Sequence, residues 1–143
     1  MLSYITKRRL LWFTATCIFV FVTLKVYAGI ALQNTINPSA EIFNYGRQVV
    51  LTGPLRCSEQ GNTALRVTLT QRSTGAVAEG QIVFECSTNL QQWTVVANTR
   101  GQQRFEPGPA VAVALGHVRS SSGGSEDAHQ WLVNVNLYNG IGR

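Results

Sequence analysis

The sequence predicts an all-β domain, an antiparallel β-sandwich of six to seven strands, behind an apolar N-terminal segment. Three observations predict it. Hydrophobic and polar residues alternate at period two over most of the chain after Gly46. Glycine, proline, asparagine and serine recur between the alternating stretches at a regular spacing, and no segment of this part shows the 3.6-residue apolar period of an amphipathic helix. A small β-barrel is the second choice.

The N-terminal segment has the pattern of a secretory signal peptide. Three basic residues, Lys7 to Arg9, precede the uncharged apolar stretch Leu10–Leu24, and compact residues follow, so that cleavage after Ala28 or Ala31 is expected. This divides the chain into a signal peptide over residues 1–28, a spacer over 29–45 and the β-sandwich domain over 46–143. The alternative is an uncleaved membrane anchor that reaches to about residue 32. Either way, the domain is expected outside the cytoplasm, secreted or in the cell envelope.

The positive charge of the chain belongs mostly to this leader. The formal net charge is +5, from 12 basic and 7 acidic residues. Four of the basic residues, Lys7, Arg8, Arg9 and Lys25, precede Ala28, which leaves eight arginines against seven acidic residues. The charge balance of the domain therefore gives no support for binding to nucleic acid.

Two cysteines remain after the leader, Cys57 and Cys86. In an exported domain they most simply form one disulfide, with two buried free thiols as the alternative. A zinc site is not expected, since the chain has no Cys-x-x-Cys motif and its two histidines are not spaced as partners. No metal or other cofactor is predicted.

The first strands are expected soon after Gly46, although a first strand or a turn of helix within Glu41–Tyr45 is also open. Pro54 would place its strand at an edge or a kink. Ala64–Gln71 is the cleanest half-buried strand, with three aliphatic side chains on one face and arginine and threonine on the other. The next expected strand is Gly80–Ser87, and both cysteines fall on the inward faces of their strands, which supports a bridge between them.

Three more strands complete the predicted sheet. In Gln92–Asn98 and Gln130–Tyr138, the residues expected inward are Trp93, Val95, Ala97, Trp131, Val133, Val135 and Leu137. The strand Ala110–Leu115 differs, because it has valines and leucine on one face and alanines on the other. Since both of its faces are apolar, it is expected either at the centre of the sheet or under an interface.

The strand rhythm over Gly46–Leu137, together with a cysteine pair and a nearby tryptophan, resembles the immunoglobulin-like or fibronectin-III-like domains of bacterial exported proteins. Cys57 and Cys86 are closer in sequence than the pair of antibody-type domains, and Trp93 follows the second cysteine instead of lying between the two. The resemblance implies adhesion, scaffolding or ligand display, and a fold alone does not fix a function.

One possible ligand or partner face is an alternating stripe of arginine and threonine, made of Arg66, Thr68, Thr70 and Arg72. On an exposed sheet face it could bind an anionic glycan or an acidic partner, and an ordinary polar sheet face is the simpler interpretation. Exposed aromatic residues such as Tyr45 or Tyr138 could serve a small ligand.

No catalytic set is predicted. Asp127 and His129 could form an acid–base pair or metal ligands, but a solvated loop end explains them more simply, as a surface position explains His117. No serine is presented by a nucleophile-elbow motif. The sequence therefore predicts an exported, non-catalytic domain that acts as a structural or protein-interaction module, with carbohydrate or small-ligand binding as the alternative. Its partner is an unknown protein or a cell-surface glycan, and it contacts a membrane only through an uncleaved leader.

Overall fold

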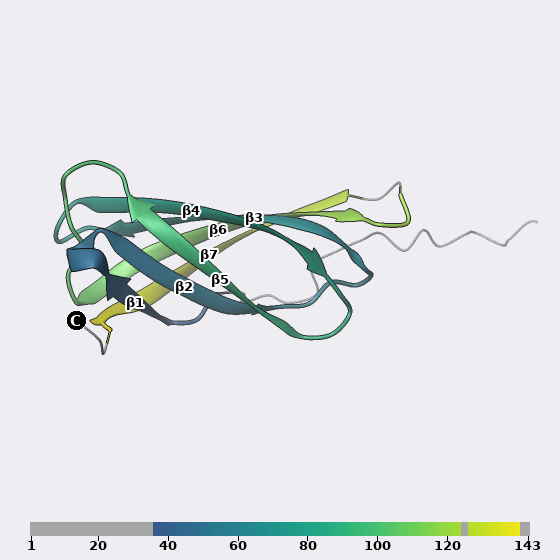
Figure 1. Cartoon of the computed structure of the whole chain (residues 1–143), viewed down its shortest axis with the longest axis horizontal. Coiled ribbons are helices and arrows are strands. Elements are labelled where there is room, and N and C mark those ends of the chain that lie inside the picture. Colours follow the sequence, from purple (N-terminus) through teal and green to yellow (C-terminus); the bar gives the residue numbers. More distant parts are fainter. Residues whose placement is uncertain (1–35, 124–125, 141–143) are drawn as a thin grey trace, which may run out of the picture.

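The computed structural model describes residues 36–123 and 126–140, and this part of the chain is built mainly from β-strands (Figure 1). Seven strands and one short 3-10 turn, η1, follow one another along it. Their bounds are β1 Ser39–Phe43, η1 Asn44–Gly46, β2 Gln48–Leu55, β3 Gly61–Gln71, β4 Ala76–Cys86, β5 Gln91–Thr99, β6 Gly108–Ser120 and β7 Glu126–Asn139. The all-β prediction is confirmed.

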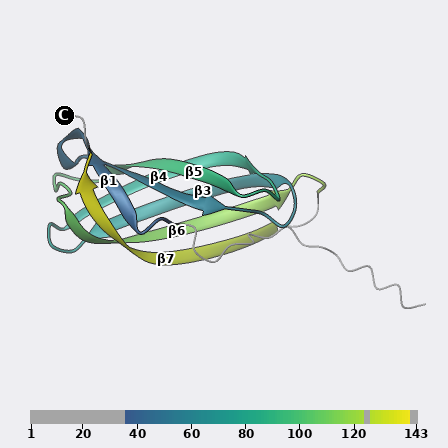
Figure 2. The same ribbon diagram turned by 90° about the horizontal axis from the view of Figure 1, so that it is seen from below.

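The strands form one closed sheet in the order β1-β2-β5-β4-β3-β6-β7, with β7 returning to β1. Neighbouring strands are antiparallel, except that β1 runs parallel to β7. Figures 1 and 2 show the strands wrapped around one elongated interior. The predicted antiparallel β-sandwich is therefore wrong, because the sheet closes into a seven-stranded barrel, the architecture that the sequence placed second.

Closure depends on two short backbone contacts that side-chain alternation does not predict. β1 joins β7 through four residue pairs, and β4 joins β5 through two pairs only, at Ala78 and Glu79. Gly80 follows this second contact, and a β-carbon there would lie 2.5 Å from Val95 Cγ1 and 2.6 Å from the Val96 carbonyl oxygen. The missing side chain at Gly80 thus lets β4 approach β5 closely enough to close the sheet.

β1 and the first two residues of η1 lie within residues 29–45, the range assigned to a spacer, so the barrel includes residues before Gly46. Ile36, which precedes β1, is already buried in the core. The predicted signal peptide, residues 1–28, lies outside the described residues. Within the described ranges, no helix is both long and apolar enough to cross a bilayer.

The barrel interior is filled by alternate side chains of the strands, as the period-two pattern predicts. On β3, Leu65, Val67 and Leu69 are buried while Arg66 and Thr70 are exposed. The inward residues predicted for β5 and β7 are buried in the same way, namely Trp93, Val95, Ala97, Trp131, Val135 and Leu137, with Val133 partly buried. On β2, Val49, Leu51 and Leu55 are buried as well. Each large apolar side chain removed from water in this way stabilises the fold by about 1.5–3 kcal/mol.

β6 turns the smaller of its two apolar faces toward the core. Ala112 and Ala114 are fully buried, whereas Val111 and Leu115 are 37% and 50% exposed. In the β3–β6 register Ala112 lies opposite the buried Leu69 and Ala114 opposite the buried Val67, so small residues of β6 stand beside large residues of β3 in the close-packed core. β6 lies between β3 and β7 in the closed sheet, and its larger side chains are left on the outside.

The predicted disulfide is confirmed. Cys57 follows β2 and Cys86 ends β4, and their sulfur atoms are bonded, with the two Cα atoms 5.8 Å apart. Both residues are at most 1% exposed, and the Cys57 backbone N–H donates to the Ser87 carbonyl oxygen at 2.9 Å. The bond ties together two strands that are not neighbours in the sheet. A buried disulfide is consistent with a location outside the cytoplasm.

Candidate functional site

The predicted arginine–threonine stripe lies on the outer surface of the barrel along β3. Arg66 and Thr70 are exposed, Thr68 is half-buried, and Arg72 lies beyond the strand in the turn to β4. β4 flanks the stripe on one side and β6 on the other. Because β4 presents charged residues and β6 presents apolar ones, the two sides of the stripe differ in chemistry.

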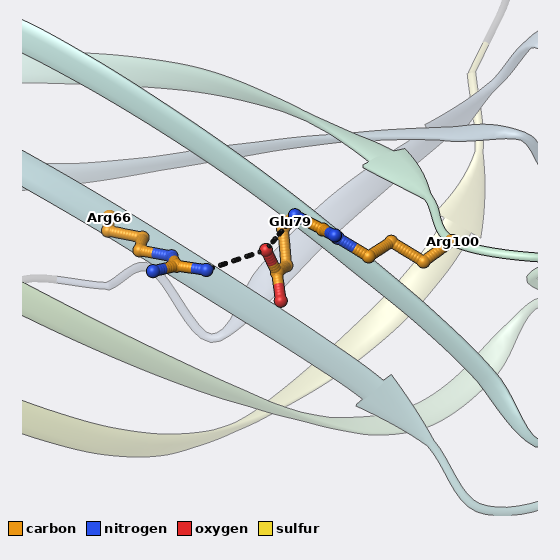
Figure 3. Close-up of polar contacts among 3 residues, drawn as sticks. All are labelled: Arg66, Glu79 and Arg100. Carbon is orange, nitrogen blue, oxygen red and sulfur yellow. Dashed lines mark hydrogen bonds and ion pairs between the residues drawn. The ribbon is translucent and has the colours of Figure 1, made fainter.

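On the β4 side, Arg66 is already paired with an acidic residue (Figure 3). Arg66 Nη2 donates to Glu79 Oε2 at 2.8 Å, and Arg100 Nη2 donates to the same oxygen at 2.6 Å. The hydrogen bond from Arg66, with the charge of Arg100 nearby, holds the pKa of Glu79 below its usual value. These residues, with Gly80 and Gln81, line a shallow hollow of about 300 Å³. One carboxylate therefore offsets one of two guanidinium charges, which weakens the expected attraction for an anionic ligand here.

On the β6 side, the outer face of the sheet is apolar. Val111 and Leu115 of β6 are exposed, Val113 is partly exposed, and Leu132 of β7 is 67% exposed. Val113 and Leu132 are direct partners in the β6–β7 register, so the four side chains form one continuous patch. We call Val111, Val113, Leu115 and Leu132 the apolar patch. It is the outward counterpart of the alanine row that packs into the core.

A second hollow, of about 490 Å³, lies where the stripe meets the apolar patch. Its lining is mostly apolar and consists of Thr70, Arg72, Ser73, Pro109, Ala110, Val111 and Asn134. No salt bridge among the described residues involves Arg72, in contrast to Arg66. The hollow thus combines an apolar wall with a guanidinium that has no carboxylate partner, and with hydroxyl and amide groups that can form hydrogen bonds.

The two histidines do not form a common site. His117 and His129 lie on β6 and β7 one register step apart, and they point to opposite sides of the ribbon. His129 Nε2 lies 3.2 Å from Asp127 Oδ2, and its ring stacks on Trp131 with the centroids 5.7 Å apart. The Asp127–His129 pair that the sequence singled out therefore exists as a contact at the surface.

His117 belongs to a separate ion-pair group. Its Nε2 lies 3.4 Å from Glu126 Oε2, and Arg119 Nε donates to Glu126 Oε1 at 2.6 Å. The hydrogen bond from Arg119 lowers the pKa of Glu126. The serines Ser120 and Ser122 hydrogen-bond to each other at 2.7 Å. In these networks, none of the described serines contacts either histidine. Within the described ranges, no group of three or more potential metal ligands is found.

The sequence did not identify the apolar patch as a surface feature. Its residues were recognised as the larger face of an apolar strand, but alternation alone does not say which face points inward when both are apolar. Leu132 could have been found from its position, because it interrupts the polar outward face of β7, where Asn134 and Asn136 follow. A single exposed leucine carries little weight in a sequence, and only the β6–β7 register places it beside Val113.

No protein-family model matches the chain, and no curated protein matches it.

Proposed function

We propose that the protein is an exported, non-catalytic interaction module that binds another protein through the outer face of β3, β6 and β7. The apolar patch is the single observation that carries this proposal. Leu132 and Leu115 are 67% and 50% exposed on strands whose opposite faces fill the core. Contiguous exposed apolar surface rimmed by polar groups is typical of protein-binding sites. A structural role without a partner would leave this surface unexplained.

The charges around the patch indicate the chemistry of the partner. Arg72 borders the patch and has no carboxylate partner among the described residues, while Arg66, which lies opposite Leu115 in the β3–β6 register, is paired with Glu79. We therefore propose that the partner presents an apolar segment with a carboxylate beside it. The apolar part would cover Leu115 and Leu132, and the carboxylate would form a charge-assisted hydrogen bond with Arg72.

Export is part of the proposal and is supported by two features. The Cys57–Cys86 disulfide is buried, and such bonds persist in oxidising compartments. The predicted leader over residues 1–28 would deliver the chain there. The proposed location is the cell envelope or the medium, and the proposed contact with a membrane is limited to an uncleaved leader.

The absence of a catalytic role is likewise a proposal. The Asp127–His129 pair is a surface contact without a neighbouring nucleophile in the described networks, and His117 pairs with Glu126. The predicted relation to immunoglobulin-like or fibronectin-III-like domains goes no further than the seven-stranded all-β fold. Carbohydrate binding, the second candidate function, is favoured by a separate aromatic cluster and is developed below.

The proposal can be tested by site-specific photo-cross-linking in the cells that export the protein. A photoreactive phenylalanine analogue would replace Leu115 in one variant and Thr94, an exposed residue of β5, in a matched control. We expect a discrete protein adduct from position 115 and none from position 94. The substitution Leu132→Arg, made together with the analogue at 115, should abolish the adduct, because it places a charge in the apolar patch.

Two results would contradict the proposal. The first is an absence of any adduct from position 115 in folded, exported protein. The second is the same set of adducts from positions 115 and 94, which would indicate collisions without a specific surface. An adduct with the mass of two copies of the chain would support the proposed surface and identify the partner as the chain itself.

A further inference from the structure

The exposed aromatic side chains of the described residues gather at one end of the barrel. Phe43, Tyr45 and Tyr138 are 36%, 73% and 45% exposed, and no other aromatic side chain of phenylalanine, tyrosine or tryptophan in the described part is as exposed. β1 runs beside the end of β7, with Glu41 opposite Tyr138, and η1 follows β1 directly. Figure 2 shows β1, the turn after it and the end of β7 together. We call Phe43, Tyr45 and Tyr138 the aromatic cluster.

The turn that carries Tyr45 has a strained backbone. Asn44 and Tyr45 have φ angles of 48° and 54°, in the left-handed region that bulky side chains seldom occupy. Such a conformation costs free energy and persists only where the surrounding structure fixes it. Here the strain presents a tyrosine to solvent, so burial of that side chain does not compensate for it.

Contacts to the β5–β6 connection hold this turn in place. The Arg47 backbone N–H donates to the Asn44 carbonyl oxygen at 3.0 Å, and the Phe105 N–H donates to the Gly46 carbonyl oxygen at 2.9 Å. A β-carbon at Gly46 would lie 2.5 Å from the Phe105 carbonyl oxygen, so only glycine permits this approach. Phe105 is itself buried in the core. The barrel therefore fixes the position of Tyr45 before any ligand arrives.

Polar groups accompany the aromatic cluster. Glu41 is half-buried on β1 opposite Tyr138, and its carboxylate lies over Gly140, in the space that a side chain at position 140 would fill. Asn44 and Asn139 are exposed at the same end. Because Asn139 pairs with the inward-facing Ile42, its side chain leaves β7 on the face opposite Tyr138, so the carboxylate of Glu41 and the amide of Asn44 are the polar groups that accompany the aromatic cluster.

We propose that this end of the barrel binds a neutral carbohydrate. The C–H groups of a sugar ring carry partial positive charge, and the faces of aromatic rings carry partial negative charge, so sugar rings stack on tyrosine and phenylalanine. The hydroxyl groups would then donate to Glu41 and exchange hydrogen bonds with Asn44. A neutral sugar is proposed because Glu41 would repel uronic or sulfated units, and the guanidinium of nearby Arg47 is turned to the Gly101 carbonyl oxygen at 3.1 Å.

The test is a titration followed by amide chemical shifts, with three neutral hexasaccharides as probes: maltohexaose, cellohexaose and chitohexaose. We expect saturable shifts with at least one of them, confined to residues 41–46 and 138–140. Tyr45→Ala should weaken that binding about fivefold to tenfold, the effect of removing one aromatic contact. Tyr45→Phe should retain it, because the ring remains. Val83→Ala, at a position on β4 that is 72% exposed and lies outside both proposed sites, is the matched control and should leave the dissociation constant unchanged.

Tyr138→Ala provides a second variant in case the strained turn rearranges when Tyr45 is replaced, since Tyr138 lies on a regular strand. It should weaken binding in the same direction. The inference is overturned if no neutral hexasaccharide shifts these amides at millimolar concentration, if Tyr45→Ala and Tyr138→Ala both bind as the parent does, or if only a heparin-derived hexasaccharide binds. None of these results bears on the apolar patch, so the proposed protein-binding function is tested separately.

Discussion

Removal of the Cys57–Cys86 disulfide is expected to be the most destabilising change available outside the aliphatic core. The cysteines are separated by 29 residues, and the chain-entropy relation assigns a loop of that length about 3–4 kcal/mol. The double variant Cys57→Ala, Cys86→Ala should lose this amount, which is a large part of the stability of a single domain. For a domain of this size, the melting temperature should fall by roughly 15–25 °C.

Urea denaturation of both proteins, followed by the fluorescence of the buried Trp93 and Trp131, measures the difference. The midpoint should fall, and the slope should rise slightly because the unfolded chain expands without the cross-link. The parent protein in reductant is the control, since it keeps both sulfur atoms and loses only the bond. The reasoning is refuted if the double variant unfolds within about 1 kcal/mol of the parent, or if native oxidised protein reacts with a thiol reagent.

Two substitutions and one titration test other contacts. Gln71→Leu should lower the free energy of unfolding by about 2–3 kcal/mol, as measured by urea denaturation. The buried Gln71 Nε2 donates to the Glu106 carbonyl oxygen at 2.8 Å, and Gln71 Oε1 accepts from the Glu106 N–H at 2.9 Å. An unchanged urea midpoint would contradict this. Gly80→Ala should separate β4 from β5 and lower the free energy of unfolding by about 1–3 kcal/mol. Hydrogen exchange at the β4–β5 pairs should become faster, and exchange at the rate of the parent protein would contradict the prediction. By carbon-13 NMR, Glu79 should titrate below its usual value of 4.5. Because the pKa of Glu79 is lower in the folded state, its ionised carboxylate stabilises the fold slightly at any pH above the unfolded-state pKa. This stabilisation is lost as the pH falls through the folded-state pKa. Titration at or above 4.5 would exclude the arginine contacts.

The strands and the disulfide could be predicted because both follow from local patterns. Leu65, Val67 and Leu69 alternate with polar residues, and a half-buried strand is the only regular element that suits this pattern. Cys57 and Cys86 occupy inward positions of their strands, so their pairing agreed with the same alternation. The information lies within a few neighbouring residues, and the tertiary structure does not overrule it.

Closure of the sheet could not be predicted, because it depends on backbone contacts between distant segments. The parallel β1–β7 contact and the two pairs at Ala78 and Glu79 leave no periodic trace in the sequence. The orientation of β6 was equally hidden, since alanines and valines are both acceptable inside a core. Packing beside large side chains such as Leu69 of β3 decides it, and that packing exists only in the folded barrel.

For the candidate sites too, local alternation could be predicted from the sequence, whereas the strand register could not. Alternation alone predicted that Arg66, Thr68 and Thr70 share the outward face of one strand, whereas Arg72 lies in the turn after β3. Their differing surroundings depend on register, which brings Glu79 to one end and leaves the other beside Val111. No single residue type signals such a difference.

The hydrogen-bond ladder between β4 and β5 is short. From Gly80 onward the two strands no longer pair, and Ile82 and Phe84 of β4 are only partly buried. At the far end of β4, Cys86 is bonded to Cys57. The disulfide thus lies where the hydrogen-bond ladder between β4 and β5 is missing, and a reducing environment would loosen this part of the barrel first.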